Sequence, residues 1–233
     1  MFQNRLSSFL SQKFNFFFRV FILAKTWGII RILLFIPYEL YYIIRLNTYT
    51  LFSINNEELD LEKKDKLHLT EYFPTPYYIL SKVFNLVKTD LVDSVFVDIG
   101  AGAGRSLTFV YNFKPKKIIG VELSKKLFSI AEDNMLKYFD EKKNVTWKLF
   151  NQDALDFNIP EDANVFFFYD PFDEHIMKKV IKKIKSSFKI KNRTILIIYI
   201  SPRCRNLFTK NSFRLIHLDI NNFNKGFAVF KYN

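Results

Sequence analysis

Four acidic residues between positions 98 and 170 stand at the end of short apolar runs or soon after them. They are Asp98, Glu122, Asp153 and Asp170. Runs of this length that are rich in Val, Ile and Phe are typical of strands. The carboxyl ends of parallel strands meet at one edge of a sheet, and ligands bind outside that edge. We therefore expect these carboxylates to surround a common site, where a strand-end acid such as Glu122 can accept both hydroxyls of a ribose.

A glycine turn follows the first of these strands. The sequence DIGAGAGR places Gly100, Gly102 and Gly104 between Asp98 and a helical pattern that begins near Arg105. Glycine allows the chain to reverse sharply, and the absence of a Cβ allows the backbone to approach a ligand. The N–H groups that open the helix point toward the same place. Nicotinamide and flavin enzymes use a similar turn, so the turn alone does not define the ligand.

These features, in this order, resemble the class I S-adenosylmethionine-dependent methyltransferases over Tyr72 to Asn233. The segment from Asp98 through the glycines is similar to the first motif of that family, Glu122 matches its ribose-binding acid, and Asp153 matches the acid beside the adenine. Asp170-Pro171-Phe172 looks like the motif after the fourth strand, at the methyl-transfer site. The resemblance implies S-adenosylmethionine as cofactor and, since a sulfonium methyl is already a strong electrophile, no metal. The implied cofactor-binding residues are Tyr72, Thr75, Asp98, Gly100, Gly102, Gly104, Glu122, Asp153 and Ala154, and the implied catalytic residues are Asp170, Pro171 and Phe172.

Most of these assignments have a purely structural alternative. Glu122 and Asp153 could be solvated acids at strand ends. Thr75 could be the N-cap of the predicted helix that follows it, a role compatible with a cofactor contact. Asp170 could cap the helix after it, with Phe172 packed in the core.

The acceptor of the methyl group is the least determined part of this interpretation. In amino-methylating relatives, an Asp/Asn-Pro-Pro-aromatic motif accepts the N–H hydrogens of the substrate while its ring stacks on a planar substrate. Here Asp173 stands after Phe172, and the second proline is absent. We expect a nitrogen acceptor, preferably a lysine-type protein side chain, with nucleic acid or a small or lipid-like molecule as alternatives. A second class of function is a non-catalytic cofactor-fold module that acts at a membrane.

The alternation of strand and helix patterns predicts how these residues are positioned. Strands are expected at 95–100, 117–123, 145–150, 165–170, 194–200, 213–220 and 226–232, with helices at 77–87, 105–112, 125–138 and 173–188. Such alternation predicts a parallel sheet covered on both faces by helices. The last two strands are joined by a short turn at 221–225 and should form a hairpin. The predicted fold class is α/β, a Rossmann-like class I methyltransferase sheet of seven strands, the last one antiparallel, with an N-terminal hydrophobic helical extension.

Composition excludes several other classes of protein. The 233 residues suffice for one substantial domain with an appendage, and 49% hydrophobic residues exclude a disordered chain. The single cysteine, Cys204, excludes an intramolecular disulfide, and three scattered histidines suggest no metal site. The net charge of +12 and the lysines of the helix at 173–188 are compatible with nucleic acid, but a solvated helix face is the favoured interpretation.

The N-terminal extension differs from the rest of the chain. Residues 14–46 are mostly apolar, but charges interrupt them so often that no uncharged stretch of about 18 residues exists, which disfavours a spanning helix. We expect one or two helices, broken near Gly28 or Pro37. They would lie on an anionic membrane surface, or dock on the catalytic domain or a second subunit. The predicted divisions are this extension at 1–54, a linker with a pre-motif helix at 55–94, and the S-adenosylmethionine-binding methyltransferase domain at 95–233. We expect the protein to be cytoplasmic or peripheral to the inner face of a membrane.

Overall fold

The computed structural model describes residues 29–54, 58–62, 68, 72–140, 145–221, 223 and 225–233, and within the first helix it describes side chains from residue 35 onward. The part of the extension before residue 29 lies outside the described residues. So do parts of the expected linker and of the turn at 221–225.

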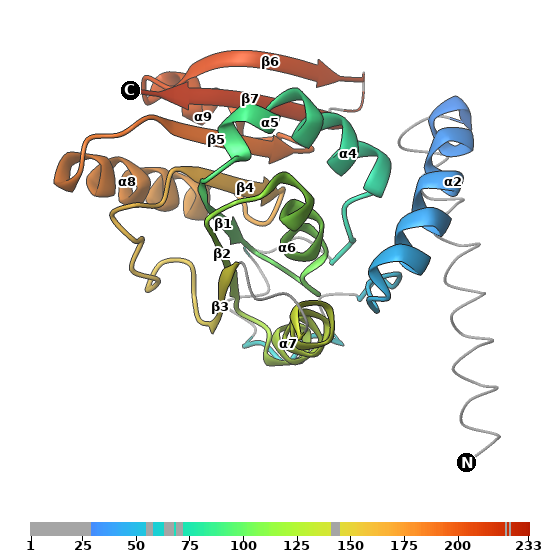
Figure 1. The fold of residues 1–233 in the computed structure, drawn as a ribbon. Helices are drawn as coiled ribbons and strands as arrows, with labels where there is room; N and C mark the ends of the chain where they lie inside the picture. The colour runs from blue at the N-terminus through green and yellow to red at the C-terminus, as the bar shows by residue number, and fades with distance from the viewer. Residues whose placement is uncertain are drawn as a thin grey trace, which may run out of the picture.

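The described strands form a single mixed sheet (Figure 1). They are β1 (Val95–Ile99), β2 (Lys117–Glu122), β3 (Thr146–Asn151), β4 (Val165–Tyr169), β5 (Ile195–Ile200), β6 (Arg214–Ile220) and β7 (Gly226–Tyr232). Their order is β3-β2-β1-β4-β5-β7-β6. Strands β1 to β5 are parallel to one another, whereas β7 is antiparallel to both β5 and β6. This arrangement confirms the predicted fold class, including the antiparallel last strand.

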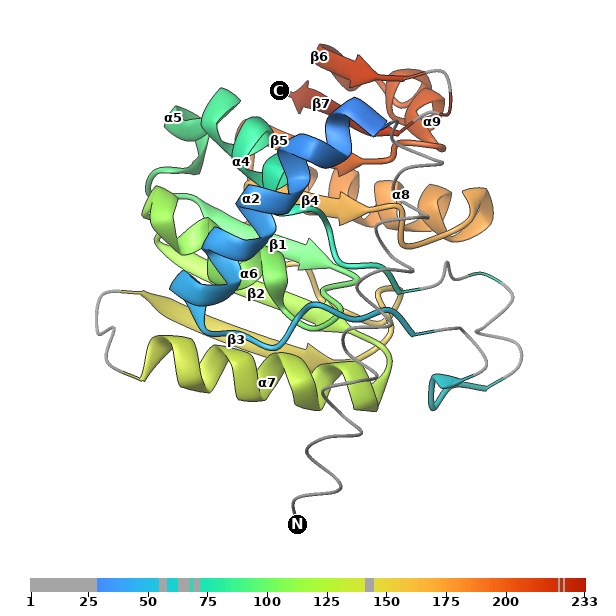
Figure 2. The ribbon, with the colours of Figure 1, turned by 90° about the vertical axis from the view of Figure 1, so that its right-hand side faces the viewer.

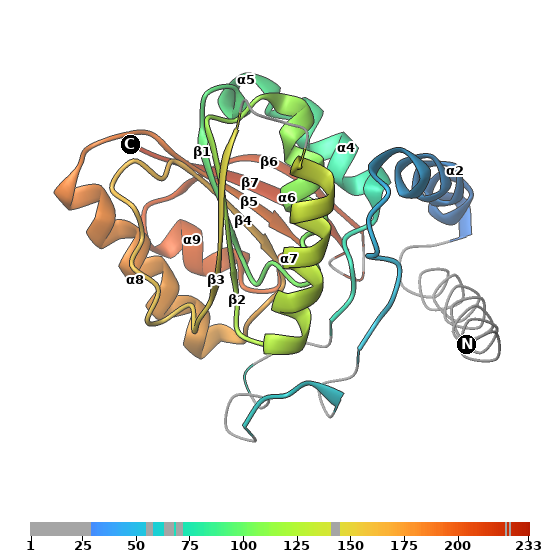
Figure 3. The same ribbon diagram turned by 60° about the horizontal axis from the view of Figure 1, so that its bottom comes forward.

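Helices cover both faces of the sheet (Figure 3). One face carries α4 (Tyr77–Leu86), α5 (Lys88–Leu91), α6 (Arg105–Val110), which ends in the 3-10 turn η2 (Tyr111–Phe113), and α7 (Lys125–Phe139), and the other carries α8 (Glu174–Ile190) and α9 (Arg205–Lys210). Side chains alternate between the two faces along each strand. Phe96 and Phe167 pack on Phe84 of α4, whereas Phe168 packs on Phe208 of α9. Each face thus buries its own aromatic core.

Helix α2 (Ile29–Leu46) docks beside α4 and crosses it at the surface of the molecule (Figure 2). Phe35 is buried, and the ring of Tyr42 packs on Tyr77 of α4. Pro37 lies inside this helix, so the expected break at Pro37 is wrong. Proline removes one helical hydrogen bond, and the packing on α4 of residues on either side of it holds the helix together. Within the described residues, no helix is long and apolar enough to cross a membrane.

The start of α4 differs from the expected pattern. The helix begins at Tyr77 with Pro76 at its N-cap position, so the expectation that Thr75 is the N-cap is wrong. The carboxylate of Glu39, which comes from α2, accepts a hydrogen bond from the Tyr77 N–H at 2.8 Å. An acceptor from another helix therefore satisfies one of the N–H groups that an N-cap side chain would otherwise bind.

Candidate active site

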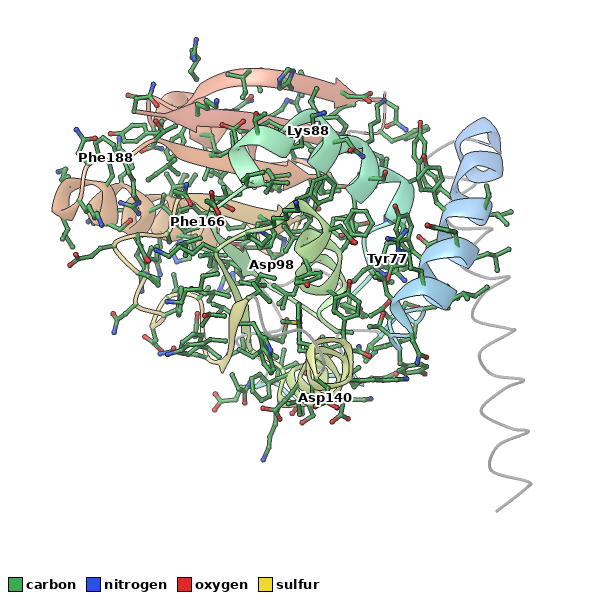
Figure 4. All side chains as sticks on the ribbon, in the orientation of Figure 1. Tyr77, Lys88, Asp98, Asp140, Phe166 and Phe188 are labelled. Carbon is green, nitrogen blue, oxygen red and sulfur yellow. The ribbon has the colours of Figure 1, made fainter. Side chains whose placement is uncertain are left out.

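A cavity opens where the carboxyl ends of β1, β2, β3 and β4 meet. It holds about 1080 Å³ of empty space, a volume that includes open solvent at its mouth. Asp98, near the centre of the molecule in Figure 4, lies on its wall. The predicted site residues that line the cavity are Tyr72, Thr75, Asp98, Gly100, Gly102, Glu122, Asp153, Ala154, Pro171 and Phe172. Gly104 and Asp170 are not among the lining residues.

Gly102 and Gly104 have different roles in the glycine turn. At Gly102, φ is +55° and an added Cβ would fall 2.2 Å from the ring of Tyr72, so a side chain there would displace that ring. The Gly102 N–H donates a hydrogen bond to Oε2 of Glu122 at 2.8 Å. At Gly104, φ is +80° and an added Cβ would meet Ala131 of α7 at 3.3 Å. Gly104 therefore allows α6 and α7 to pack closely, which accounts for its position outside the cavity wall.

The Asp98 side chain is buried with one oxygen atom lacking a partner. It is 2% exposed, and its Oδ2 accepts a hydrogen bond from the Ser106 hydroxyl. Its Oδ1 is buried and has no hydrogen-bond partner among the described residues. Burial raises the pKa of Asp98 to about 7; the Ser106 hydrogen bond opposes this rise, and the charge of Glu122 adds to it. Since buried carboxylate oxygens are ordinarily hydrogen-bonded, Oδ1 is suited to receive a donor from a ligand.

Glu122 is held in one orientation by backbone groups. Its Oε2 accepts from the Gly102 N–H, and its Oε1 accepts from the Ser124 N–H at 2.9 Å. Burial raises the pKa of the Glu122 carboxyl, although these N–H groups act in the opposite direction. Each carboxylate oxygen has a second lone pair, so an oriented Glu122 can still accept hydrogen bonds from two neighbouring hydroxyls.

The turn after β3 brings Asp153 and Ala154 to the cavity. Oδ1 of Asp153 accepts a hydrogen bond from the Leu155 N–H at 2.7 Å, which fixes this turn. The Gln152 N–H donates to the Glu122 carbonyl oxygen at 3.1 Å. The segments after β2 and β3 are therefore tied together at the rim of the site.

Arg105 is a cavity-lining residue that the sequence analysis missed as a site residue. Its buried guanidinium donates to the Glu39 carboxylate at 2.8 Å, to the Thr50 hydroxyl at 3.0 Å and to the Thr75 carbonyl at 3.0 Å. It also lies 4.2 Å from the centre of the Tyr77 ring. The first residue of α6 is thus bonded to the N-terminal extension and to the segment before α4. The signal in the sequence was the lone Glu39, an acid within an apolar stretch.

The three residues of the motif after β4 do not act as a unit. Pro171 and the buried ring of Phe172 line the cavity. The Asp170 carboxylate instead accepts from Nε of Arg203 at 2.8 Å and from the Tyr199 hydroxyl at 3.4 Å. Burial raises the pKa of Asp170, and Arg203 opposes that rise. The structure therefore brings two of the three predicted catalytic residues to the cavity and directs the carboxylate of the third toward the loop after β5.

A histidine–aspartate pair stands at the wall of the same cavity. Nδ1 of His68 lies 2.6 Å from Oδ2 of Asp173, and the Asp173 N–H donates to the His68 carbonyl at 2.9 Å. The other oxygen of Asp173 accepts from the Ile176 N–H at 3.0 Å, so Asp173, and not Asp170, is the N-cap of α8. His68 lines the cavity, with its side chain 41% exposed. This pair could not be predicted from the sequence, because its members are far apart in the chain.

The strand order, the antiparallel β7 and the glycine turn beside a cavity at the strand ends define a class I methyltransferase fold. Solved structures agree with this conclusion. No protein-family model and no curated protein sequence matches the chain.

Three similar structures come from different organisms. A protein from Escherichia coli assigned as a methyltransferase superposes with a TM-score of 0.52 at 15% identity, over 68% of this chain and 86% of that one. A protein from Pyrococcus horikoshii assigned as an RNA methyltransferase gives 0.51 at 20% identity, over 76% and 93%. A protein from Haemophilus influenzae assigned as a methylase gives 0.50 at 20% identity, over 68% and 98%. At these identities the likeness establishes the fold.

Proposed function

We propose that this protein is an S-adenosylmethionine-dependent methyltransferase. The observation that supports this most strongly is the buried, unpartnered Oδ1 of Asp98 on the wall of a cavity that also holds the oriented Glu122 carboxylate. Isothermal titration of the full chain with S-adenosylmethionine tests the proposal. Binding at one site per chain supports it, and the absence of binding by folded protein refutes it.

The cavity residues fit the chemical groups of this cofactor. Glu122 would accept hydrogen bonds from the ribose hydroxyls, and Oδ1 of Asp98 would accept from the cationic amino group, since a carboxylate is the natural partner of an ammonium. Gly102 lines the cavity, and its backbone would lie close to the bound ligand. The remaining proposed contacts are Asp153 and Ala154 for the adenine and Tyr72 and Thr75 for the methionine end.

The cofactor supplies a methyl group on a positively charged sulfur, which a nucleophile can attack directly. The protein must hold the acceptor in line with that methyl group and exclude water from it. Pro171 and Phe172 are apolar groups on the cavity wall that would do so. Because the Asp170 carboxylate is bound to Arg203, we propose that Asp170 acts in the motif by fixing this turn, whose φ at Asp170 is +42°.

We propose a nitrogen acceptor, preferably a lysine-type side chain of a protein. Phe73, Tyr169 and Phe172 are among the residues that line the cavity, and their aromatic side chains suit a long apolar stem that ends in a polar amine. Nucleic acid and small or lipid-like molecules are the alternatives, the former favoured by the lysine-rich helix α8. Transfer of a tritiated methyl group into fractionated lysate, followed by protease or nuclease treatment, decides among them. A label that is released by protease treatment but not by nuclease treatment supports the protein acceptor.

We also propose that the protein binds an anionic membrane surface through α2. The side of this helix that faces away from α4 exposes three large apolar side chains, with Leu40 and Tyr41 each 52% exposed and Ile44 79% exposed. Arg45, also exposed, lies beside them and would attract anionic lipid. The full chain should co-sediment with vesicles that contain phosphatidylserine, and the double variant Leu40→Ser/Ile44→Ser should not. Equal sedimentation of both proteins, or of neither, would refute membrane binding through this surface.

A further inference from the structure

We propose that His68, oriented by Asp173, is the catalytic base that removes the proton from the methyl acceptor. This inference rests on the proposed function and adds a residue and a step to it. The sequence resemblance points to Asp170 for a role at the acceptor, but the Asp170 carboxylate is bound to Arg203 and Tyr199. His68 lines the cavity, and a second titratable group, the Asp173 carboxylate, is in hydrogen-bond contact with its imidazole ring.

The geometry fixes which nitrogen of His68 would act. An ionised Asp173 accepts hydrogen bonds only, so the close contact between its Oδ2 and Nδ1 of His68 requires a proton on Nδ1. In the neutral imidazole, Nε2 then carries the free lone pair. Nε2 has no protein partner among the described residues and belongs to a side chain that lines the cavity. In this tautomer, the pair therefore offers the Nε2 lone pair as a base for a group bound in that cavity.

Three hydrogen bonds hold Asp173 in the position that this role needs. Its Oδ1 caps α8 through the Ile176 N–H, its Oδ2 binds His68, and its own N–H binds the His68 carbonyl. Burial is the largest single influence on the pKa of the Asp173 carboxyl and raises it. The hydrogen bonds from Ile176 and His68 together outweigh burial and lower this pKa below its ordinary value, so Asp173 is ionised at neutral pH. His175, which follows in α8, stacks on the His68 ring at 5.7 Å between ring centres. Tertiary contacts thus fix the side chain of His68 from two sides.

The presence of Asp173 after Phe172, where the sequence departs from the motif of amino-methylating relatives, is explained by this arrangement. Asp173 stands after Phe172, where the ring of Phe172 lines the cavity, and Ile176 in the next turn lines it as well. An acceptor held between these apolar groups would lie beside the His68 imidazole. Asp173, which stands where this chain departs from the Asp/Asn-Pro-Pro-aromatic motif, is therefore the residue that orients His68.

The proposed step balances as follows. The acceptor carries an N–H or O–H hydrogen, and its lone pair forms the new bond to the methyl carbon. The bond between that carbon and the sulfur breaks, and its electron pair remains on the sulfur, which becomes a neutral thioether. The hydrogen leaves the acceptor as a proton and binds Nε2 of His68. Asp173 stabilises the resulting imidazolium, which then releases the proton to solvent through the exposed part of the ring.

The test combines three full-length variants with two measurements. His68→Gln removes the base, Asp173→Asn keeps a good N-cap for α8 while removing the negative charge, and His217→Gln is the control because His217 is exposed on β6. The first measurement is ¹⁵N NMR of histidine-labelled, cofactor-free protein, in which the three histidines give separate ring signals. The second is the affinity for S-adenosylmethionine together with the rate of tritiated-methyl transfer into lysate.

We expect the NMR spectra to show His68 with its proton on Nδ1 at pH 8, and Asp173→Asn to reduce the population of that tautomer. His68→Gln should bind cofactor within about 3-fold of the wild type and transfer methyl groups about 10²-fold more slowly or worse, the scale of general-base catalysis. Asp173→Asn should slow transfer at least about 10-fold, and His217→Gln should match the wild type.

A proton on Nε2 in the wild type, or His68→Gln with an unchanged transfer rate, would overturn the role of His68 while leaving the proposed function standing. A wild type that does not bind the cofactor, or that binds it and labels nothing, overturns the proposed function and this inference together.

Discussion

Replacement of Asp98 by asparagine should raise stability at alkaline pH while it weakens cofactor binding. The folded protein holds this carboxyl in a buried site where its pKa is about 7, against 3.8 for an ordinary aspartate. Between these values the folded state binds a proton that the unfolded state has released, so this group makes the wild type less stable as the pH rises. Asparagine is neutral at every pH and lacks this dependence.

The magnitude follows from the two pKa values. At about 1.4 kcal/mol per pKa unit, the cost of ionising buried Asp98 grows by roughly 2–3 kcal/mol between pH 5 and pH 8. For a chain of this size, such a change corresponds to about 5–10 °C in the midpoint of thermal unfolding. The difference in midpoint between Asp98→Asn and the wild type should therefore increase by about that amount from pH 5 to pH 8. Other titrating groups are common to both proteins and largely cancel in the difference.

Differential scanning calorimetry of both proteins at several pH values measures this difference. Asp140→Asn serves as a control, because Asp140 is exposed at the end of α7 (Figure 4) and its replacement should leave the pH dependence of the midpoint unchanged. A difference between Asp98→Asn and the wild type that stays constant from pH 5 to pH 8 would contradict this prediction. It would mean that Asp98 does not hold a proton in the folded protein.

Three further predictions concern the site and its supports. Glu122→Ala should weaken S-adenosylmethionine binding by about 1.5–3 kcal/mol in a folded protein, the range for hydrogen bonds to a charged group, and unchanged affinity in a titration would remove Glu122 from the ribose site. Glu39→Gln should destabilise the fold by about 3–5 kcal/mol in urea unfolding, because it leaves the buried Arg105 charge unpaired. The control Glu174→Gln removes one partner of an exposed ion pair and should leave the midpoint of unfolding unchanged. Similar midpoints for the two variants would contradict the structural role of α2. Gly102→Ala should lower cofactor affinity at least about 10-fold, because the new methyl group displaces Tyr72 and strains a backbone with φ of +55°; wild-type affinity would show that the ring and the turn adjust freely.

The sheet and the strand-end acids could be predicted because their signals are local in sequence. Each strand is a continuous apolar run, and a parallel sheet brings the ends of such runs together without any information on side-chain contacts. Asp98 and Glu122 therefore lie on one cavity as the sequence predicts. The antiparallel last strand could also be predicted, because only a short turn separates it from the strand before it and such a turn joins the two strands of a hairpin.

The supporting contacts could not be predicted because they join segments far apart in the chain. Glu39 pairs with Arg105, and His68 pairs with Asp173, and neither pair has a fixed spacing that a motif could describe. The same limitation explains the error at Thr75: the residue is a reasonable N-cap by type, but Glu39 from another helix supplies the acceptor. An acid in an apolar stretch, such as Glu39, is the one local sign that a buried partner exists.

The most direct test of the central claim is the titration of the full chain with S-adenosylmethionine, run in parallel on the wild type, Glu122→Ala and the control Asp140→Asn. We expect binding at one site per chain for the wild type and the control, and binding weakened at least about 10-fold for Glu122→Ala. A wild-type protein that is folded by circular dichroism and gives no binding heat at two temperatures would show that this chain does not bind S-adenosylmethionine.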